Sequence, residues 1–367
     1  MWEFFREVYK VLDDEGLLIV WFTHSDPKAW EAIVGSLYAA GFALSKAWPV
    51  WTEMAQRRVA LFTSAFFTSL ALVLRKRSVA DVVTTGESES SKLIQDENVK
   101  RTISYGVFDA LSSAYNSKAS GLEIFIMGLA GAIAGVTRVW NPDIDRIKIQ
   151  TESLEVYFDN EEEEPDKLRF KSALQYFGNT LYPAAIYIGS STMLEDTFKK
   201  AKLEDAVRDI LSSDNLTQAY LIFWVTTRFS DSNEIPYDFM EKICKILKIN
   251  YNQLSYVGLL AQTQKSYKIL FGKECYDAIK GRIPALTKTV AGQAIHLLKM
   301  IGELPKDDVK KIVKEVLNVM PVSHSVAATA LFLLRTAKSN ELNLVGLSEL
   351  TRDVVDKALE LLYRGVY

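Results

Sequence analysis

Apolar and polar residues follow one another along the first eighty positions in an order that predicts helix, strand, helix, strand, strand. Residues 2–14 place their apolar side chains on one side of a helix, and Leu17 begins the unbroken apolar run LLIVWF. Such a run is typical of a strand covered on both faces. A second helix is expected to end at Gly41, and strands are expected at 42–51 and 66–74. Continuous apolar strands joined through a helix predict an α/β sheet that is largely parallel.

The pattern changes after residue 77. Residues 78–98 are polar, charged and poor in aromatic side chains, which predicts a linker or an exposed loop. Beyond them the apolar positions keep helical spacing almost throughout. Helices are expected at about 99–118, 122–136, 152–158, 192–212, 214–229, 236–248, 267–280, 286–302, 305–318, 323–338 and 349–364. The sequence therefore predicts an α/β lobe at 1–77, a linker at 78–98 and a helical domain at 99–367.

Composition narrows the class of protein only slightly. The chain has 367 residues with a formal charge of −3, whereas a protein that binds DNA alone and without specificity usually carries a basic excess. Any contact with DNA is therefore expected to be weak and local. The most apolar stretch, 59–74, is shorter than the roughly twenty residues that a membrane-spanning helix needs, so no membrane association is expected.

The two cysteines predict neither a zinc site nor a disulfide. Cys244 and Cys275 lie far apart in sequence, without a CxxC motif or neighbouring histidines. No other residue cluster suggests a metal site. The charged residues Glu3, Arg6 and Glu7 occupy the position where a signal peptide would be apolar. These features together predict a reducing, cytoplasmic setting.

Several short motifs follow one another in residues 2–77. They are VLDDEGLLIV at 11–20, FTHS at 22–25, AWE at 29–31, AGF at 40–42, AWPVWTE at 47–53 and LALVLRKR at 70–77. In order and spacing this stretch resembles the adenine-specific DNA methylases of archaea and bacteria that carry an uncharacterised N-terminal domain. The close resemblance covers about a fifth of the chain. The helical remainder resembles the long C-terminal extension of these enzymes.

The resemblance implies that these pieces are the fifth, sixth and seventh strands of a class I, Rossmann-like methyltransferase sheet. The family's donor-binding turn, DPFxGxG, and its catalytic motif, DPPY, lie upstream of the matched region, and neither occurs in this chain. Without the glycine-rich turn, no backbone amides are present to hold S-adenosylmethionine. The resemblance thus implies no catalytic residue in this chain, and S-adenosylmethionine binding only in complex with a complementing chain.

The expected function is that of a C-terminal portion or subunit of an S-adenosylmethionine-dependent DNA adenine N6-methyltransferase, inactive alone. The complementing N-terminal chain would supply the donor-binding and DPPY motifs. A half-sheet leaves an unpaired edge strand, which favours association; a homodimer through this edge is the competing arrangement. Two alternatives stay open: a non-enzymatic remnant of a methylase, and a helical scaffold that binds protein or DNA.

Five residues are candidates for a substrate pocket. His24 follows the first strand, and α/β sheets bind their ligands at the carboxyl ends of strands, although a histidine there can equally cap the turn that follows. Trp48, Pro49, Thr52 and Glu53 come at a bend in the second strand, because proline is awkward inside a central strand. They would either line a base pocket or pack the sheet against the helical region.

Two basic clusters bracket the third strand and are the candidates for DNA binding. Arg57 and Arg58 precede it, and Arg75, Lys76 and Arg77 follow it. Basic side chains placed in this way can contact phosphates. They are also ordinary solubility features at the ends of apolar strands, and the sequence does not separate the two interpretations.

Overall fold

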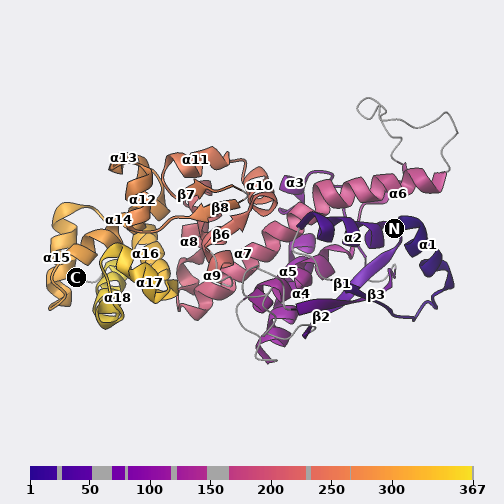
Figure 1. Cartoon of the computed structure of the whole chain (residues 1–367), viewed down its shortest axis with the longest axis horizontal. Coiled ribbons are helices and arrows are strands. Elements are labelled where there is room, and N and C mark those ends of the chain that lie inside the picture. Colours follow the sequence, from indigo (N-terminus) through magenta and orange to yellow (C-terminus); the bar gives the residue numbers. More distant parts are fainter. Residues whose placement is uncertain are drawn as a thin grey trace. The chain divides into compact units, whose positions relative to one another are not determined.

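The computed structural model describes residues 1–22, 27–51, 68–78, 82–116, 122–146, 165–228, 233–264 and 266–365. The described chain is mostly helical, with three small sheets (Figure 1). Two compact units share it, Met1–Thr192 and Met193–Tyr367. The division between units thus falls well after 78–98, and residues 99–192 pack with the N-terminal α/β segment.

The first unit contains a sheet of three strands, β1 (Leu18–Phe22), β2 (Phe42–Trp51) and β3 (Thr68–Lys76). Their positions agree with the expected strands to within two residues. The order is β1-β3-β2, and β3 runs antiparallel to both neighbours. The expectation of a largely parallel sheet is therefore wrong for both pairings, because a continuous apolar run indicates burial and carries no information about strand direction. β1 and β2, both antiparallel to β3, are parallel to one another.

Two helices flank this sheet in the chain, α1 (Trp2–Val11) and α2 (Pro27–Ala39). Trp30 on α2 makes an edge-to-face contact with Phe22 at the end of β1, with ring centroids 4.6 Å apart. Leu37 and Tyr38 of α2 are fully buried. Gly41 follows with a φ of +98°, a conformation that favours glycine and turns the chain from α2 into β2.

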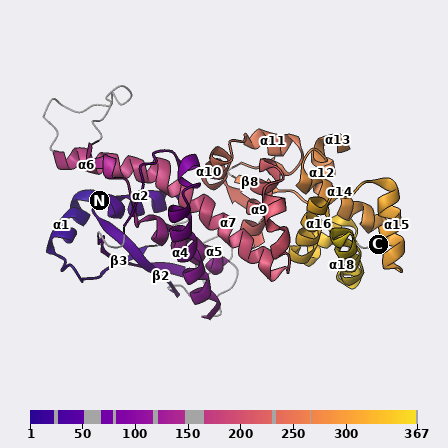
Figure 2. The same cartoon turned by 180° about the vertical axis from the view of Figure 1, so that it is seen from behind.

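A pair of closely packed helices lies beside β2, α4 (Glu97–Asn116) and α5 (Leu122–Val136) (Figure 1, Figure 2). Glycine makes the close approach possible. A Cβ atom added at Gly106 would lie 2.3 Å from the carbonyl oxygen of Gly131, and one added at Gly135 would lie 2.6 Å from the Cα of Ile103. After α5, the hydroxyl of Thr137 accepts a hydrogen bond from the backbone N–H of Leu44 at 2.9 Å. This bond ties the end of α5 to β2.

The segment that composition marks as a linker contains ordered structure. β4 (Val83–Thr84) pairs in parallel with β5 (Val139–Trp140), and α3 (Ser90–Leu93) buries Leu93 completely. The described part of 78–98 therefore packs into the first unit. The other elements that begin in this unit are η2 (Pro142–Arg146), α6 (Pro165–Tyr176), the π-helical turn η3 (Phe177–Leu181) and α7 (Tyr182–Lys200). The expected helix at 152–158 lies outside the described residues.

The second unit is built from helices and one small sheet. Its helical elements are η4 (Glu204–Ala206), α8 (Val207–Leu211), α9 (Asn215–Arg228), α10 (Tyr237–Ile246), α11 (Tyr251–Tyr256), α12 (Lys273–Ala278), α13 (Ile283–Leu286), α14 (Val290–Glu303), α15 (Val309–Val319), α16 (His324–Thr336), α17 (Ser339–Leu342), η5 (Asn343–Val345) and α18 (Glu349–Arg364). The sheet has the order β6-β8-β7, from β6 (Glu234–Pro236), β7 (Leu260–Gln262) and β8 (Ser266–Ile269).

Six of the expected helices in this unit coincide with α9, α10, α14, α15, α16 and α18 to within a few residues. The helix expected at 267–280 is wrong in its first half, where β8 buries the alternate residues Tyr267 and Ile269. Gly272, with a φ of +54°, then separates this strand from α12. Among the described residues, each helix is too short or too polar to pass through a bilayer.

Candidate functional site

One face of the β1-β3-β2 sheet exposes large apolar side chains. Residues opposite one another in register point to the same face of a sheet. Trp21 lies opposite Ala71, which lies opposite Trp48. Trp21 is 59% exposed and Trp48 is 51% exposed. The neighbouring row adds Ile19, which is 51% exposed, and we call the whole surface the tryptophan face: Ile19, Trp21, Lys46, Trp48, Ala71 and Val73.

The opposite face of the same sheet is covered along β2 and β3, whereas Leu18, Val20 and Phe22 of β1 are only half-buried on it. Leu44, Leu72 and Leu74 point to it and are each only 1% exposed. The sequence prediction that LLIVWF is a strand covered on both faces is therefore wrong for β1, because Ile19 and Trp21 are exposed and the alternate residues are only half-buried. The exposed side chains of the tryptophan face stand on β1 and β2, on either side of Ala71 and Val73, which are themselves buried. Exposed apolar patches can mark interaction sites in soluble proteins.

The tryptophan face ends at a strand edge without a neighbour. β1 is the outer strand, and within the described part of the chain only β3 pairs with it. The outward backbone N–H and C=O groups of β1 are therefore available to an additional strand. The other outer strand, β2, has α5 along its side. The two edges of the sheet thus differ: one is covered by a helix and one is open.

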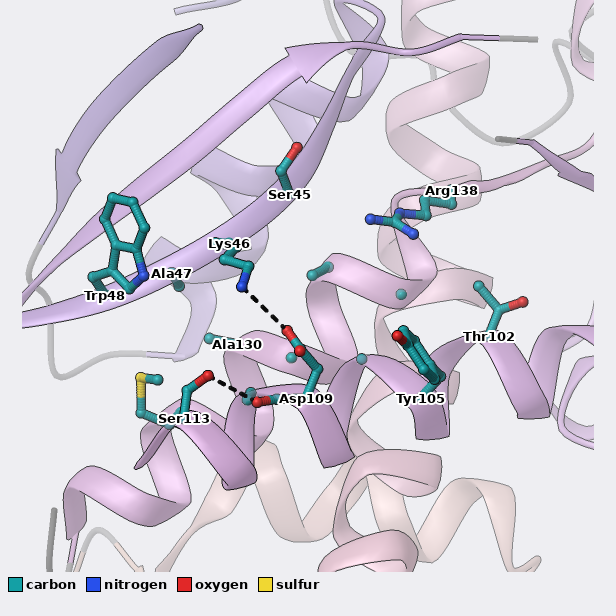
Figure 3. Close-up of a pocket in the computed structure, with 16 residues that line it drawn as sticks. Ser45, Lys46, Ala47, Trp48, Thr102, Tyr105, Asp109, Ser113, Ala130 and Arg138 are labelled. Atoms are coloured by element: carbon teal, nitrogen blue, oxygen red, sulfur yellow. Dashed lines mark hydrogen bonds and ion pairs between the residues drawn. The ribbon is translucent and has the colours of Figure 1, made fainter. Parts of the chain in front are cut away.

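A groove lies between β2 and the α4–α5 pair, with a volume of about 60 Å³ (Figure 3). It begins where the pairing of β2 with β3 shifts register between Leu44 and Lys46, so that Ser45 is the extra residue of a β-bulge. Bulges redirect side chains and are common beside functional sites. The groove is lined by Ser45, Lys46, Ala47, Trp48, Thr102, Tyr105, Gly106, Asp109, Ala110, Ser113, Met127, Ala130, Gly131, Ala134, Gly135 and Arg138.

Two positively charged side chains lie in this groove. The Lys46 Nζ is 3.8 Å from a carboxylate oxygen of Asp109, and both side chains are half exposed, so the attraction between them is weak. Arg138 is half-buried, and among the described residues no carboxylate lies within ion-pair distance of it. Its guanidinium extends toward the β2 side of the groove (Figure 3). Within the described part of the chain, the groove therefore holds one weakly paired cation and one cation without a carboxylate partner.

Exposed aromatic rings stand at the two ends of the groove. Trp48 lies at one end on β2, and Tyr105, which is 69% exposed, lies at the other end on α4 (Figure 3). The floor consists of small residues of α4 and α5, among them Gly106 and Gly131. The arrangement combines flat apolar surfaces with positive charge. Trp48 belongs to both the groove and the tryptophan face.

The sequence-predicted pocket residues are described only in part. Trp48 lines the groove, and the backbone of Pro49 continues β2 opposite Leu70. His24, Thr52 and Glu53 lie outside the described residues. Of the five candidates, the structure therefore assigns an environment to Trp48 alone.

Of the predicted DNA-binding residues, Arg57 and Arg58 lie outside the described part of the chain. Arg75 is half exposed, with a guanidinium nitrogen 3.7 Å from a carboxylate oxygen of Glu15. The Nζ of Lys76 donates a 3.0 Å hydrogen bond to Asp14 and lies over the ring of Tyr9, with its nitrogen 4.8 Å from the ring centroid.

Arg77 turns inward. Its guanidinium donates hydrogen bonds to the backbone oxygens of Tyr38 at 2.8 Å, Phe42 at 3.3 Å and Thr137 at 3.2 Å. It also lies over the rings of Tyr38 and Trp140, at 4.2 and 4.9 Å from their centroids. Burial lowers the pKa of this guanidinium. Its donors and its ring contacts are used inside the first unit, so Arg77 joins α2, β2 and the end of α5.

The candidate groove residues that sequence reasoning missed are Lys46 on β2, and Tyr105, Asp109 and Arg138. The last three come from a long amphipathic helix and a helix end, where no motif distinguishes them from ordinary surface residues. Only the packing of α4 and α5 beside β2 brings them together with Lys46 and Trp48.

Three contacts in the second unit join charged or titratable side chains to one another. Arg228 makes a paired contact with the buried Glu341, and Arg335 does the same with Asp356 at 2.6 Å. The hydroxyl of Tyr276 contacts Nδ1 of His296, and burial lowers the pKa of that histidine. Among the described residues, no three histidine, cysteine or acidic side chains are grouped as a metal site would require.

Fold and site together define a mostly helical protein with a small three-stranded α/β lobe, one open strand edge and a groove of mixed charge and aromatic character. No protein-family model, curated protein or solved structure matches the chain.

Proposed function

We propose that this chain is the C-terminal subunit of an S-adenosylmethionine-dependent DNA adenine N6-methyltransferase, inactive until a partner chain supplies the donor-binding and DPPY motifs. The order of the strands is the observation that carries this proposal. In a class I methyltransferase sheet, the seventh strand lies between the fifth and the sixth and runs antiparallel to both. β3 lies in this way between β1 and β2.

The helix between these strands supports the same assignment. α2 connects β1 to β2, and these two strands are parallel and separated by one other strand. A helical crossover between parallel strands is the building unit of α/β sheets. The order of elements, β1, α2, β2, β3, is the one that the fifth, sixth and seventh strands of the class I fold require.

The open edge of β1 is where the proposed partner would bind. In the class I sheet the fourth strand lies beside the fifth and parallel to it, so the partner's strand would pair with the outward edge of β1. Apolar elements of the partner would then cover Ile19 and Trp21. We therefore assign the tryptophan face on β1 to a methyltransferase N-terminal half. A second copy of this chain would pair β1 with β1, and the two-fold symmetry of such a dimer would make these strands antiparallel.

The proposed division of labour follows from the residues present. The partner would hold S-adenosylmethionine through its glycine-rich turn and bind the adenine amino group with its DPPY motif. This chain would complete the sheet and so fix the position of the partner's catalytic strand. Without β1 alongside, that strand would itself be an exposed edge, which explains why neither chain alone is expected to transfer methyl groups.

The proposal is tested by purifying the tagged chain from its native cells and identifying the proteins that accompany it. We expect an equimolar partner that carries DPFxGxG and DPPY, and methyl transfer to adenine in DNA by the pair but by neither chain alone. The variant Trp21→Glu should lose the partner, whereas Leu350→Glu, at an apolar residue that is 94% exposed in the second unit, should keep it. A chain that purifies alone or as a homodimer, or a pair without methyl transfer, contradicts the proposal.

A further inference from the structure

We propose that the groove between β2 and α4–α5 binds single-stranded DNA. One phosphate would lie between Lys46 and Arg138, and the bases on either side would stack on Trp48 and Tyr105. The choice of DNA as the nucleic acid rests on the proposed function. The site itself rests on the geometry of the groove, which lies outside the docking edge of β1.

The size of the groove suggests that the phosphate and the bases of the strand would bind at different places. A volume of about 60 Å³ has space for a few water molecules. A compact anionic group fits such a space, and the bases would stack on its rim. The exposed rings of Trp48 and Tyr105 are on that rim, at opposite ends (Figure 3).

The charges inside the groove favour an anion. Arg138 has no carboxylate partner among the described residues, and its planar guanidinium is suited to two phosphate oxygens at once. The ion-pair partner of Lys46 in the described part of the chain is Asp109, at 3.8 Å. Asp109 partly neutralises Lys46 in the free protein and would repel an incoming phosphate. The carboxylate therefore limits affinity, and its removal should strengthen binding.

The aromatic residues favour a single strand over a duplex. Proteins that bind single strands combine a positive groove along the backbone with rings on which successive bases stack. In a duplex the bases are already stacked on one another and are not available to Trp48 or Tyr105. Binding of a duplex through phosphates alone would require more than the two cations of this groove, in a chain whose formal charge is −3.

The groove and the partner-binding edge are compatible. Trp48 lies on β2, and β3 separates it from β1. A partner strand that pairs with the outer edge of β1 would leave the groove side of β2 accessible. A methyltransferase acts on a base that is single-stranded or extruded from the duplex, and this groove would hold unpaired nucleotides at one side of the completed sheet.

The test measures binding of a fluorescein-labelled 12-nucleotide DNA strand of mixed sequence to the full chain, by fluorescence anisotropy. We expect the single strand to bind at least about ten times more tightly than the same sequence as a duplex. Trp48→Ala and Tyr105→Ala should each weaken binding by about 5- to 150-fold, and Trp48→Phe should retain most of it. Arg138→Gln and Lys46→Gln should each lower the slope of log affinity against log salt by about 0.7.

Asp109→Asn provides a result that damage to the fold cannot imitate, because this variant should bind the strand more tightly. Arg208→Gln serves as the control, since it removes one exposed positive charge from the second unit and should change nothing. Equal binding of duplex and single strand, tighter binding of the same sequence as RNA, or effects at Arg138 no larger than at Arg208, would overturn the proposal.

This measurement needs no partner chain. Loss of binding in the isolated chain would therefore refute the groove while leaving the proposed methyltransferase function to its own test. Binding of the strand by the isolated chain, without methyl transfer by any pair, would support the groove and refute the proposed methyltransferase function.

Discussion

Substitution of Arg77 by methionine tests whether this residue holds the fold or contacts DNA. Sequence alone groups Arg77 with Arg75 and Lys76 as a basic cluster. In the structure its guanidinium bonds three backbone carbonyls and lies over the rings of Tyr38 and Trp140. Methionine keeps a flexible apolar side chain of similar reach and removes all of these polar contacts.

The expected loss of stability can be worked out contact by contact. Each buried carbonyl left without its charged donor costs about 1–3 kcal/mol, although the oxygen of Tyr38 keeps the backbone N–H of Gly41 at 3.0 Å. Loss of the two ring contacts adds about 1–2 kcal/mol. Several kcal/mol of this loss are offset, because methionine avoids the cost of burying a charge that has no carboxylate partner among the described residues. The net destabilisation of the first unit should be about 3 kcal/mol.

Arg75→Met is the matched control. This neighbouring guanidinium is half exposed and lies 3.7 Å from a fully solvated carboxylate of Glu15, so its pair is worth about 0.5 kcal/mol or less. Urea unfolding followed by tryptophan fluorescence suits the comparison, because six of the seven tryptophans lie in Met1–Thr192. With a slope of about 2 kcal/mol per molar urea, the two midpoints should differ by more than about 1 M.

Midpoints for Arg77→Met and Arg75→Met that agree within about 0.3 M would refute the reasoning, since Arg77 would then be an ordinary surface residue. A change in the salt dependence of DNA binding at Arg77→Met, in protein that remains folded, would restore the assignment of this residue to a DNA contact.

Three further results are expected. Ellman's reagent should react with neither Cys244 nor Cys275 in the native chain and with both after unfolding, because both thiols are buried and burial raises the pKa of Cys244 to about 12; fast reaction of either in the native state contradicts this. Burial lowers the pKa of His296 below its ordinary 6.5, so the unfolded chain binds the proton more readily than the folded chain. The melting temperature should therefore be constant at higher pH and fall as the pH drops through 6.5. In His296→Gln this fall should be less steep. Gly131→Ala places a Cβ 2.3 Å from the oxygen of Gly106 and should cost about 1–3 kcal/mol in urea unfolding, whereas Gly86→Ala, with no atom within 4 Å, should cost far less.

Local sequence signals were sufficient for the elements up to β3 and for α4 and α5, whereas α6 and most of α7 were not expected. The strand expected at 42–51 and the helix expected at 122–136 have the bounds of β2 and α5. The second strand follows Gly41, whose positive φ ends the preceding turn. The helix is a long run of apolar and small residues that returns to polar sequence after Val136. Such signals act over a few residues, so they survive in any tertiary arrangement.

Signals that depend on tertiary packing were not available from the sequence. The run LLIVWF does not reveal that Ile19 and Trp21 face solvent, because their exposure depends on which elements pack on the sheet. Strand direction is likewise a property of the pairing. Short strands such as β8 are not recognisable within a sequence of helical pattern, since three or four residues are too few to establish a period of two.

The candidate site illustrates the same limit. Trp48 was identifiable because it lies next to Pro49 in a recognisable strand. Tyr105 and Arg138 come from separate elements and meet Lys46 only through helix packing. For Arg77 the sequence suggested a surface role that the structure does not support. It belongs to a basic cluster in the sequence, but its contacts lie inside the first unit.

The close contact of α4 and α5 also gives a means to recognise divergent relatives of this protein. Three positions in that contact have no room for a Cβ atom, at Gly106, Gly131 and Gly135. Mutations elsewhere in the two helices change apolar residues for one another at modest cost, whereas any side chain at these three positions should destabilise the helix contact. A glycine followed by two further glycines four residues apart, with the spacing Gly-x24-Gly-x3-Gly, should therefore persist across descent after the surrounding sequence has diverged. Its presence beside a three-strand lobe would mark common ancestry where overall identity no longer does.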